Sequence, residues 1–191
     1  HAETPIGWTA LLWAALSDQE PMVRWLLEQG ACVRERDLVL VAYAGSPGSL
    51  AALLDAWAGE AAALRSEPSG QTLLHLTCLG LCHLGREDPQ RYLAAADLLL
   101  ARGLPVDARE ARKGRTALQS YVAHPNWKRR RLEDSEAHLA LARLLRERGA
   151  SATVCDWEGH SAISLAESLG LPRVRAVLTS PGEGAGAAAK L

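Results

Sequence analysis

An internal repeat constrains this chain more than any other feature of its sequence. Four segments open on Gly-x-Thr or Gly-x-Ser and run on as apolar residues: GWTALLWAAL, GQTLLHLTC, GRTALQSYV and GHSAISLAE. Three later segments place leucines shortly before a glycine: VRWLLEQGA, ADLLLARGL and ARLLRERGA. Glycine suits the left-handed turn that ends a helix, and a threonine or serine can cap the start of one. Each unit is therefore predicted to hold two helices.

The spacing between the helices explains why the repeat has no clean period. A first-helix residue precedes a second-helix leucine by 15 residues at Leu11–Leu26, Leu38–Leu53 and Ile163–Leu178. The same interval is 25 residues at Leu74–Leu99 and 26 at Leu118–Leu144. We therefore predict five helix pairs, two of which carry about ten inserted residues between their helices.

The combined pattern resembles the ankyrin repeat. GWTALLWAAL and MVRWLLEQGACV match that family's opening and closing segments, and His75 stands at the position of its histidine. The second unit lacks the usual opening, and no unit has the proline of that motif. The resemblance implies an all-α solenoid of about five stacked helix pairs with short hairpin fingers, because each pair has an apolar face that only a neighbouring pair can bury. It also implies that His75 links adjacent units by side-chain hydrogen bonds.

The resemblance covers residues 3–179. The predicted units are 3–36, 37–66, 67–110, 111–154 and 155–179, and residues 180–191 form a predicted flexible Gly/Ala tail whose Lys190-Leu191 end suggests a vector origin.

Composition agrees with a helical, globular chain. Hydrophobic residues make up 48% of the 191 residues, phenylalanine is absent, and alanine and leucine dominate. The formal net charge of −1 argues against a general polyanion binder, so nucleic acid is not the expected partner. No apolar stretch reaches the roughly 18 residues of a membrane-spanning helix. The four cysteines are predicted to be buried free thiols, which indicates a cytoplasmic or nuclear location.

One stretch offers metal-ligand residue types. His75, Cys78, Cys82 and His83 are spaced so that the first three share a helix face, and thiolate and imidazole groups bind zinc. The spacing differs from the usual closed zinc patterns, and two of the four fall on framework positions of the repeat. We therefore expect no metal and no cofactor.

The candidate partner-binding residues combine tryptophan with arginine, which are the residues enriched in interface hot spots. Trp127 adjoins the basic run Lys128, Arg129, Arg130 and Arg131 in the insertion of the fourth unit. Arg86 lies in the insertion of the third unit, and we expect the two insertions to emerge side by side as one composite surface. Trp13 and Trp25 are expected in the core.

Trp8 and Trp157 stand in predicted fingers, where they could bind a partner or pack on a neighbouring finger. The basic run could equally be a nuclear import signal or a solvated loop paired with its neighbouring acids.

No phosphate loop, nucleophile elbow or two-histidine metal motif is present, so no catalytic residue is proposed. The resemblance predicts a non-enzymatic adaptor, inhibitor or scaffold that binds a partner protein, here an acidic and partly apolar segment, through its concave face, fingers and insertions. The alternative is a regulatory or recruiting segment of a larger enzyme, channel or ubiquitin-ligase adaptor. No small-molecule substrate is expected.

Overall fold

The computed structural model describes residues 8–85, 88–129, 132 and 135–180. Within these ranges the regular elements are helices, and no strand forms beyond one isolated bridge between Ser66 and Gln71. The first helices of the five pairs are α1 (Ala10–Leu16), α3 (Glu35–Ala44), α5 (Leu73–Leu84), α7 (Ala117–Val122) and α10 (Ala162–Leu169). The second helices are α2 (Glu20–Glu28), α4 (Pro47–Ala56), α6 (Gln90–Ala101), α9 (Glu136–Glu147) and α11 (Pro172–Thr179). A short helix, α8 (Asn126–Arg129), lies between α7 and α9.

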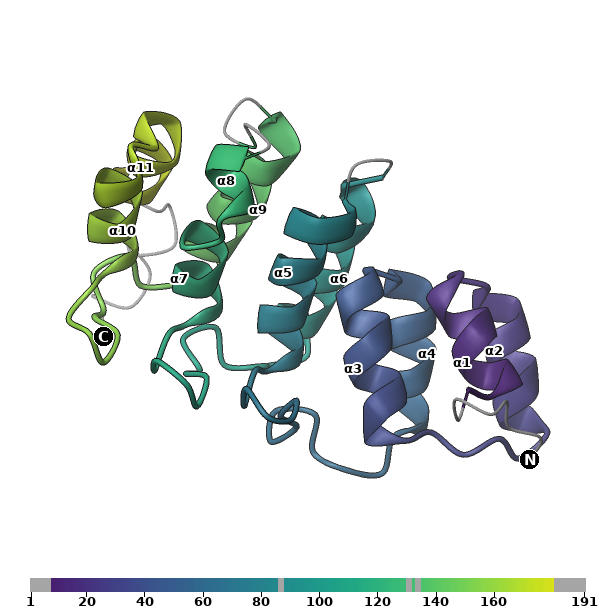
Figure 1. Cartoon of the computed structure of the whole chain (residues 1–191). Helices are drawn as coiled ribbons and strands as arrows, with labels where there is room; N and C mark the ends of the chain where they lie inside the picture. The colour runs from purple at the N-terminus through teal and green to yellow at the C-terminus, as the bar shows by residue number, and fades with distance from the viewer. Residues whose placement is uncertain (1–7, 86–87, 130–131, 133–134, 181–191) are drawn as a thin grey trace, which may run out of the picture.

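The pairs stand in a single row, with the first helices along one side and the second helices along the other (Figure 1). Two groups of buried apolar side chains fill the row. One joins α1 to α4 with part of α5 and α6, and the other joins the rest of α5 and α6 to α11. The predicted solenoid of five helix pairs is confirmed. In the described part of the chain, no helix is long and apolar enough to cross a membrane.

Hydroxyl caps begin four of the five first helices, as the sequence predicts. The side-chain oxygens of Thr9, Thr72, Thr116 and Ser161 each accept a hydrogen bond from the backbone N–H three residues later. These bonds satisfy donors that would otherwise lack partners at the helix start. The cap therefore fixes where each unit turns from finger into helix.

The second unit begins its helix with a charged pair instead of a hydroxyl. Asp37 is fully buried, and its carboxylate accepts hydrogen bonds from the backbone N–H of Arg34 at 3.0 Å and from the Arg34 guanidinium at 3.3 Å. A carboxylate in the first helical turn also interacts favourably with the helix dipole. The missing Gly-x-Thr opening is thus replaced by another cap.

The second helices show that the expected equivalence of Leu26 and Leu144 is wrong by one residue. Measured from the glycine that follows each helix, Leu26 corresponds to Leu99 and to Leu145, each four residues before its glycine. Leu99 and Leu145 are fully buried, whereas Leu144 is only partly buried. The inserted residues of the fourth unit hide this register in the sequence.

Candidate partner-binding surface

Three hairpin turns project from one end of the helices and form what we call the finger row, residues 65–71, 109–115 and 155–160 (Figure 1). Each turn is closed by a backbone bond of 2.9 Å: Ser66 N–H to Gln71 O, Glu110 N–H to Arg115 O, and Asp156 N–H to His160 O. Neighbouring fingers are joined by further backbone bonds, from Ala111 N–H to Ser69 O at 3.1 Å and from Trp157 N–H to Lys113 O at 2.9 Å. The row is therefore one connected surface.

Trp157 is the most exposed large apolar residue on this row, with 65% of its surface accessible. Its indole lies against Gly114, where an added Cβ would come within 2.4 Å of the indole nitrogen. Gly114 also has a φ of 67°, which disfavours other residues. Trp157 thus packs on the neighbouring finger, as one of its two alternatives expects, and keeps most of its surface open.

Arginine lies beside this tryptophan. The Arg109 guanidinium donates a 2.8 Å hydrogen bond to the carbonyl oxygen of Gly114, the residue that carries the Trp157 ring. Arg112 is exposed on the same finger, and Arg65 on the preceding one. Among the described residues, these three arginines have no carboxylate within ion-pair distance. Arg109 therefore brings positive charge close to the exposed Trp157 ring, and Arg65 and Arg112 add positive charge elsewhere on the finger row.

Two other cations of the row, Lys113 and Arg115, are paired across fingers, whereas the Glu110 carboxylate accepts backbone hydrogen bonds within its own finger. Lys113 lies 3.0 Å from Glu158, and Arg115 lies 2.9 Å from Asp156 and 3.4 Å from Glu158. Burial would raise the pKa of Asp156, but hydrogen bonds from the backbone N–H of His160 and from Arg115 outweigh it, and the pKa is lowered. These ion pairs hold the finger of residues 109–115 to the finger of residues 155–160.

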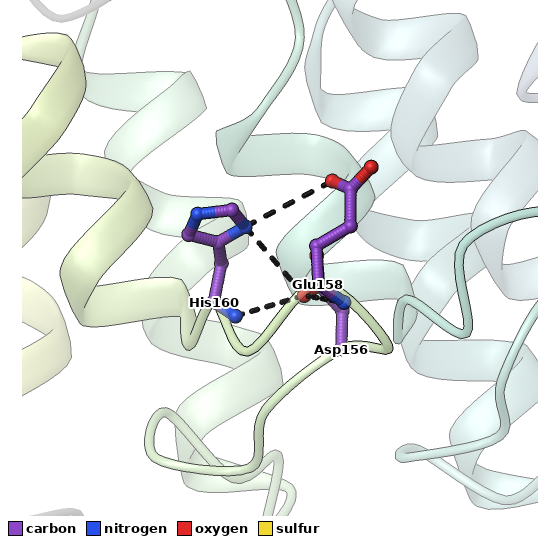
Figure 2. Close-up of side chains that lie close together, drawn as sticks. All are labelled: Asp156, Glu158 and His160. Carbon is purple, nitrogen blue, oxygen red and sulfur yellow. Dashed lines mark hydrogen bonds and ion pairs between the residues drawn. The ribbon is translucent and has the colours of Figure 1, made fainter.

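Asp156, Glu158 and His160 are grouped closely enough to raise the question of a metal ion, and Figure 2 shows the three side chains converging. Both carboxylates are already engaged: Asp156 accepts bonds from the backbone N–H of Glu158 and His160 and from Arg115, and Glu158 faces Lys113. Two cations neutralise the two carboxylates, so the group acts as a structural tie between fingers.

The four residues considered for zinc make separate contacts. Cys78 and Cys82 are buried among core side chains, and burial raises the pKa of the Cys78 thiol to about 12. His75 is buried and bonded to the next unit, while His83 is exposed at the end of α5. The expectation that all four cysteines are buried is wrong for Cys32 and Cys155, which are exposed.

Trp127 is not part of an exposed surface, so that expectation is wrong. It is 1% accessible, and its indole N–H donates a 2.6 Å hydrogen bond to the carbonyl oxygen of Tyr121. Its ring meets the rings of Tyr121 and His138 nearly edge-on. The insertion folds back as α8, which turns the indole into the core.

The remaining residues of the predicted basic surface are not tested by the structure. Arg86, Arg130 and Arg131 lie outside the described residues, as do the side chains of Lys128 and Arg129. The two insertions do meet where they are described. His124 Nε2 lies 2.8 Å from His83 Nε2, and the Asn126 amide donates to Cys82 O at 2.9 Å.

The N-terminal tryptophans also differ from expectation. Trp13 and Trp25 were expected in the core but are 52% and 54% accessible. Trp8, a predicted finger residue, is half-buried and packs against Trp13, with ring centroids 4.5 Å apart. An apolar helical pattern shows that a side chain faces a neighbouring unit, and no described unit lies in front of the first pair.

Comparison with known proteins agrees with this architecture. The ankyrin repeat family model matches residues 6–38. The structure resembles the crystal structure of the ankyrin repeat domain of Bcl-3, described as a unique member of the IkappaB protein family. That match has a TM-score of 0.65 and 26% sequence identity, and covers 89% of this chain and 68% of that chain. A search of curated protein sequences gave no match. The chain contains an ankyrin repeat and has the fold of an ankyrin repeat domain, and ankyrin repeats are in general protein–protein interaction modules.

Sequence reasoning found Trp157 but missed Arg65, Arg109 and Arg112 as its companions. Isolated arginines in turns carry no distinct signal in a sequence. The Gly-x-Thr and Gly-x-Ser openings at Gly70, Gly114 and Gly159 mark the ends of the three fingers and would have aligned these arginines.

Proposed function

We propose that this chain is a non-enzymatic adaptor or inhibitor that binds a partner protein through the finger row and the adjoining concave side of the solenoid. The observation that carries the proposal is the juxtaposition at Gly114, which holds the exposed Trp157 ring on one side and bonds the Arg109 guanidinium through its carbonyl. A rigid aromatic beside a planar guanidinium can bury area and pair with a carboxylate at once.

The proposed partner is an acidic, partly apolar protein segment. Arg65, Arg109 and Arg112 supply positive charge and form no ion pair with a described carboxylate, and Trp157 supplies apolar area. The predicted contribution of Lys128 to Arg131 and of Arg86 remains part of this proposal, whereas Trp127 no longer does because it is buried.

The test uses the whole chain as bait in a cell extract, followed by quantitative mass spectrometry and calorimetric affinity measurement with the purified partner. The double variant Trp157→Ala with Arg109→Glu should weaken binding at least tenfold, about 1.4 kcal/mol. The control, Trp25→Ala with Arg24→Glu, removes an exposed tryptophan and an exposed charge on α2, away from the fingers, and should bind normally. Normal binding by the finger variant, at an unchanged thermal midpoint, would refute the proposed surface.

We also propose a cytoplasmic or nuclear location. The support is the presence of free cysteines, two of them exposed, which suits a reducing compartment. Imaging of a tagged chain tests it, and localisation in the secretory pathway would contradict it.

A further inference from the structure

The outer face of the first helix pair carries large apolar side chains in solvent. We call this the leading end face and define it by Ala10, Trp13, Met22, Trp25 and Leu26. Trp13, Met22 and Trp25 are 52%, 51% and 54% accessible. A hollow of about 410 Å³ opens on the same helix pair, lined by residues 9–11 at the start of α1, by Leu26 and by residues 29–32. Apolar side chains of this size are normally covered by another structural element.

The equivalent positions in the other units show what covers such residues. Trp13 lies four residues after the helix cap, and the residues at that position are Leu38, Leu76 and Leu165 in three later units. They are 0%, 8% and 7% accessible. Leu38 and Leu76 belong to the apolar group that joins their unit to the preceding one. In the fourth unit this position is Ser120, which is partly buried. A preceding helix pair therefore buries the position of Trp13 in three of the four later units.

The second helix gives the same result. Met22 lies eight residues before the glycine that follows its helix, and Ala95 and Leu141, both fully buried, hold that position in the third and fourth units. Leu26 is only partly buried, whereas its equivalents Leu99 and Leu145 are inaccessible. Both helices of the first pair thus present interface residues at positions where the described residues include no neighbouring helix pair.

The site of the hollow in the first unit is occupied by a packed side chain in the third unit. Ala31 follows the glycine of the first unit as Leu104 follows that of the third. Leu104 is 7% accessible and packs in the same apolar group as Leu53 and Leu64 of the preceding unit. At the first unit this place is open, and Ala31 and Leu26 line it.

The opposite end of the solenoid is built differently. In the first helix of each unit, the residue six positions after the cap marks this difference. It is Ala15, Cys78 and Val122 in three units, and all three are fully buried. In the last unit it is Glu167, which is exposed and pairs with Arg175 at 3.0 Å. A polar outer face is what a terminal unit of a solenoid needs for solubility. The last pair is a cap, and the first pair has the surface of an internal unit.

We propose that the leading end face is the seat of a further ankyrin-type helix pair, stacked in front of α1 and α2 in the same parallel register as the other junctions. The charged trailing end of a second copy does not match this apolar face. A symmetric contact between two leading end faces would set Trp13 and Trp25 against their own copies, a packing that occurs at no junction within the chain.

The probe is a helix pair of consensus ankyrin sequence fused to the N-terminus of the whole 191-residue chain. Hydrogen exchange measured by mass spectrometry should show amides of α1 and α2 exchanging at least tenfold more slowly in the fusion. The fusion carrying Trp13→Glu and Met22→Glu should lose this protection. Because both side chains are half exposed, the same substitutions should leave the unfused chain folded, which its circular dichroism spectrum checks. The control fusion with Leu84→Glu, an equally exposed leucine elsewhere, should keep the protection.

Two results would overturn the proposal. One is unchanged exchange of α1 and α2 in the fusion. The other is a concentration-dependent dimer of the unfused chain in sedimentation velocity that Trp13→Glu abolishes, since a second copy would then be the occupant.

Discussion

The imidazole of His75 reaches across a unit boundary to the backbone of Arg115, with Nε2 3.0 Å from the carbonyl oxygen. Its other nitrogen lies 2.8 Å from the Thr72 hydroxyl, so the same ring closes a helix cap and links the third unit to the fourth. Gln119 holds the equivalent position one unit later and donates to the carbonyl oxygens of Val154 and His160, both at 2.8 Å. The expected role of His75 in tying adjacent units is confirmed.

Replacing His75 by leucine should lower the free energy of unfolding by about 1–3 kcal/mol, because the Arg115 carbonyl and the Thr72 cap lose a partner in a buried place. Urea unfolding followed by circular dichroism measures the loss. The His75→Gln variant should recover part of it, because glutamine makes the corresponding bonds at residue 119. Equal losses in both variants would show that volume rather than hydrogen bonding decides this position.

Leu145→Ala should lower the free energy of unfolding by about 2–5 kcal/mol, since Leu145 is fully buried between two units. Leu26→Ala, the equivalent change in the first unit, should cost about half as much or less, because Leu26 borders the open leading end face. Paired urea titrations compare the two variants directly. A larger loss for Leu26→Ala would mean that the equivalence of these positions is wrong.

Trp127→Ala should act on stability rather than on recognition. The indole is buried, donates to Tyr121 O and meets two other rings, so its removal should cost about 3–5 kcal/mol and lower the thermal midpoint. Differential scanning calorimetry measures this change. A variant that melts as the unchanged chain does, yet binds its partner more weakly, would restore Trp127 to the proposed binding surface.

Stability should fall on mild acidification. Burial lowers the pKa of His138 to about 4 from an ordinary value near 6.5, and burial also lowers the pKa of His75. The unfolded chain then binds protons that the folded chain does not. The stabilisation is therefore complete above pH 6.5 and is lost as the pH falls towards 4. We expect a loss on the order of 2 kcal/mol over that window. The His138→Gln variant should show a smaller change between the two pH values, and an identical slope would contradict the assignment.

The thiols should separate into two classes. Cys32 and Cys155 are exposed, whereas Cys78 and Cys82 are buried and the Cys78 thiol has its pKa raised to about 12. An aromatic disulfide reagent should titrate two thiols in the native protein and four after denaturation. Rapid reaction of all four without denaturant would show that the core around α5 opens readily.

Much of the fold follows from short-range features of the sequence. Glycine after three of the leucine pairs, hydroxyl residues before four of the first helices, and His75 at its family position define helix ends and caps through contacts within three or four residues. Such contacts depend on local chemistry, so the sequence by itself determined where the helices of each pair begin and end.

The tertiary structure decided which apolar side chains are buried. Trp127 and Trp13 both stand in apolar surroundings in the sequence, yet one is enclosed because α8 folds back, and the other is exposed because no described unit precedes α1. It also decided that Arg109 and Trp157, 48 residues apart, meet at Gly114. Whether a side chain is buried, and which residues it meets, depends on what stacks against its face of the helix pair. The assembled solenoid decides this, and no local segment of the sequence does.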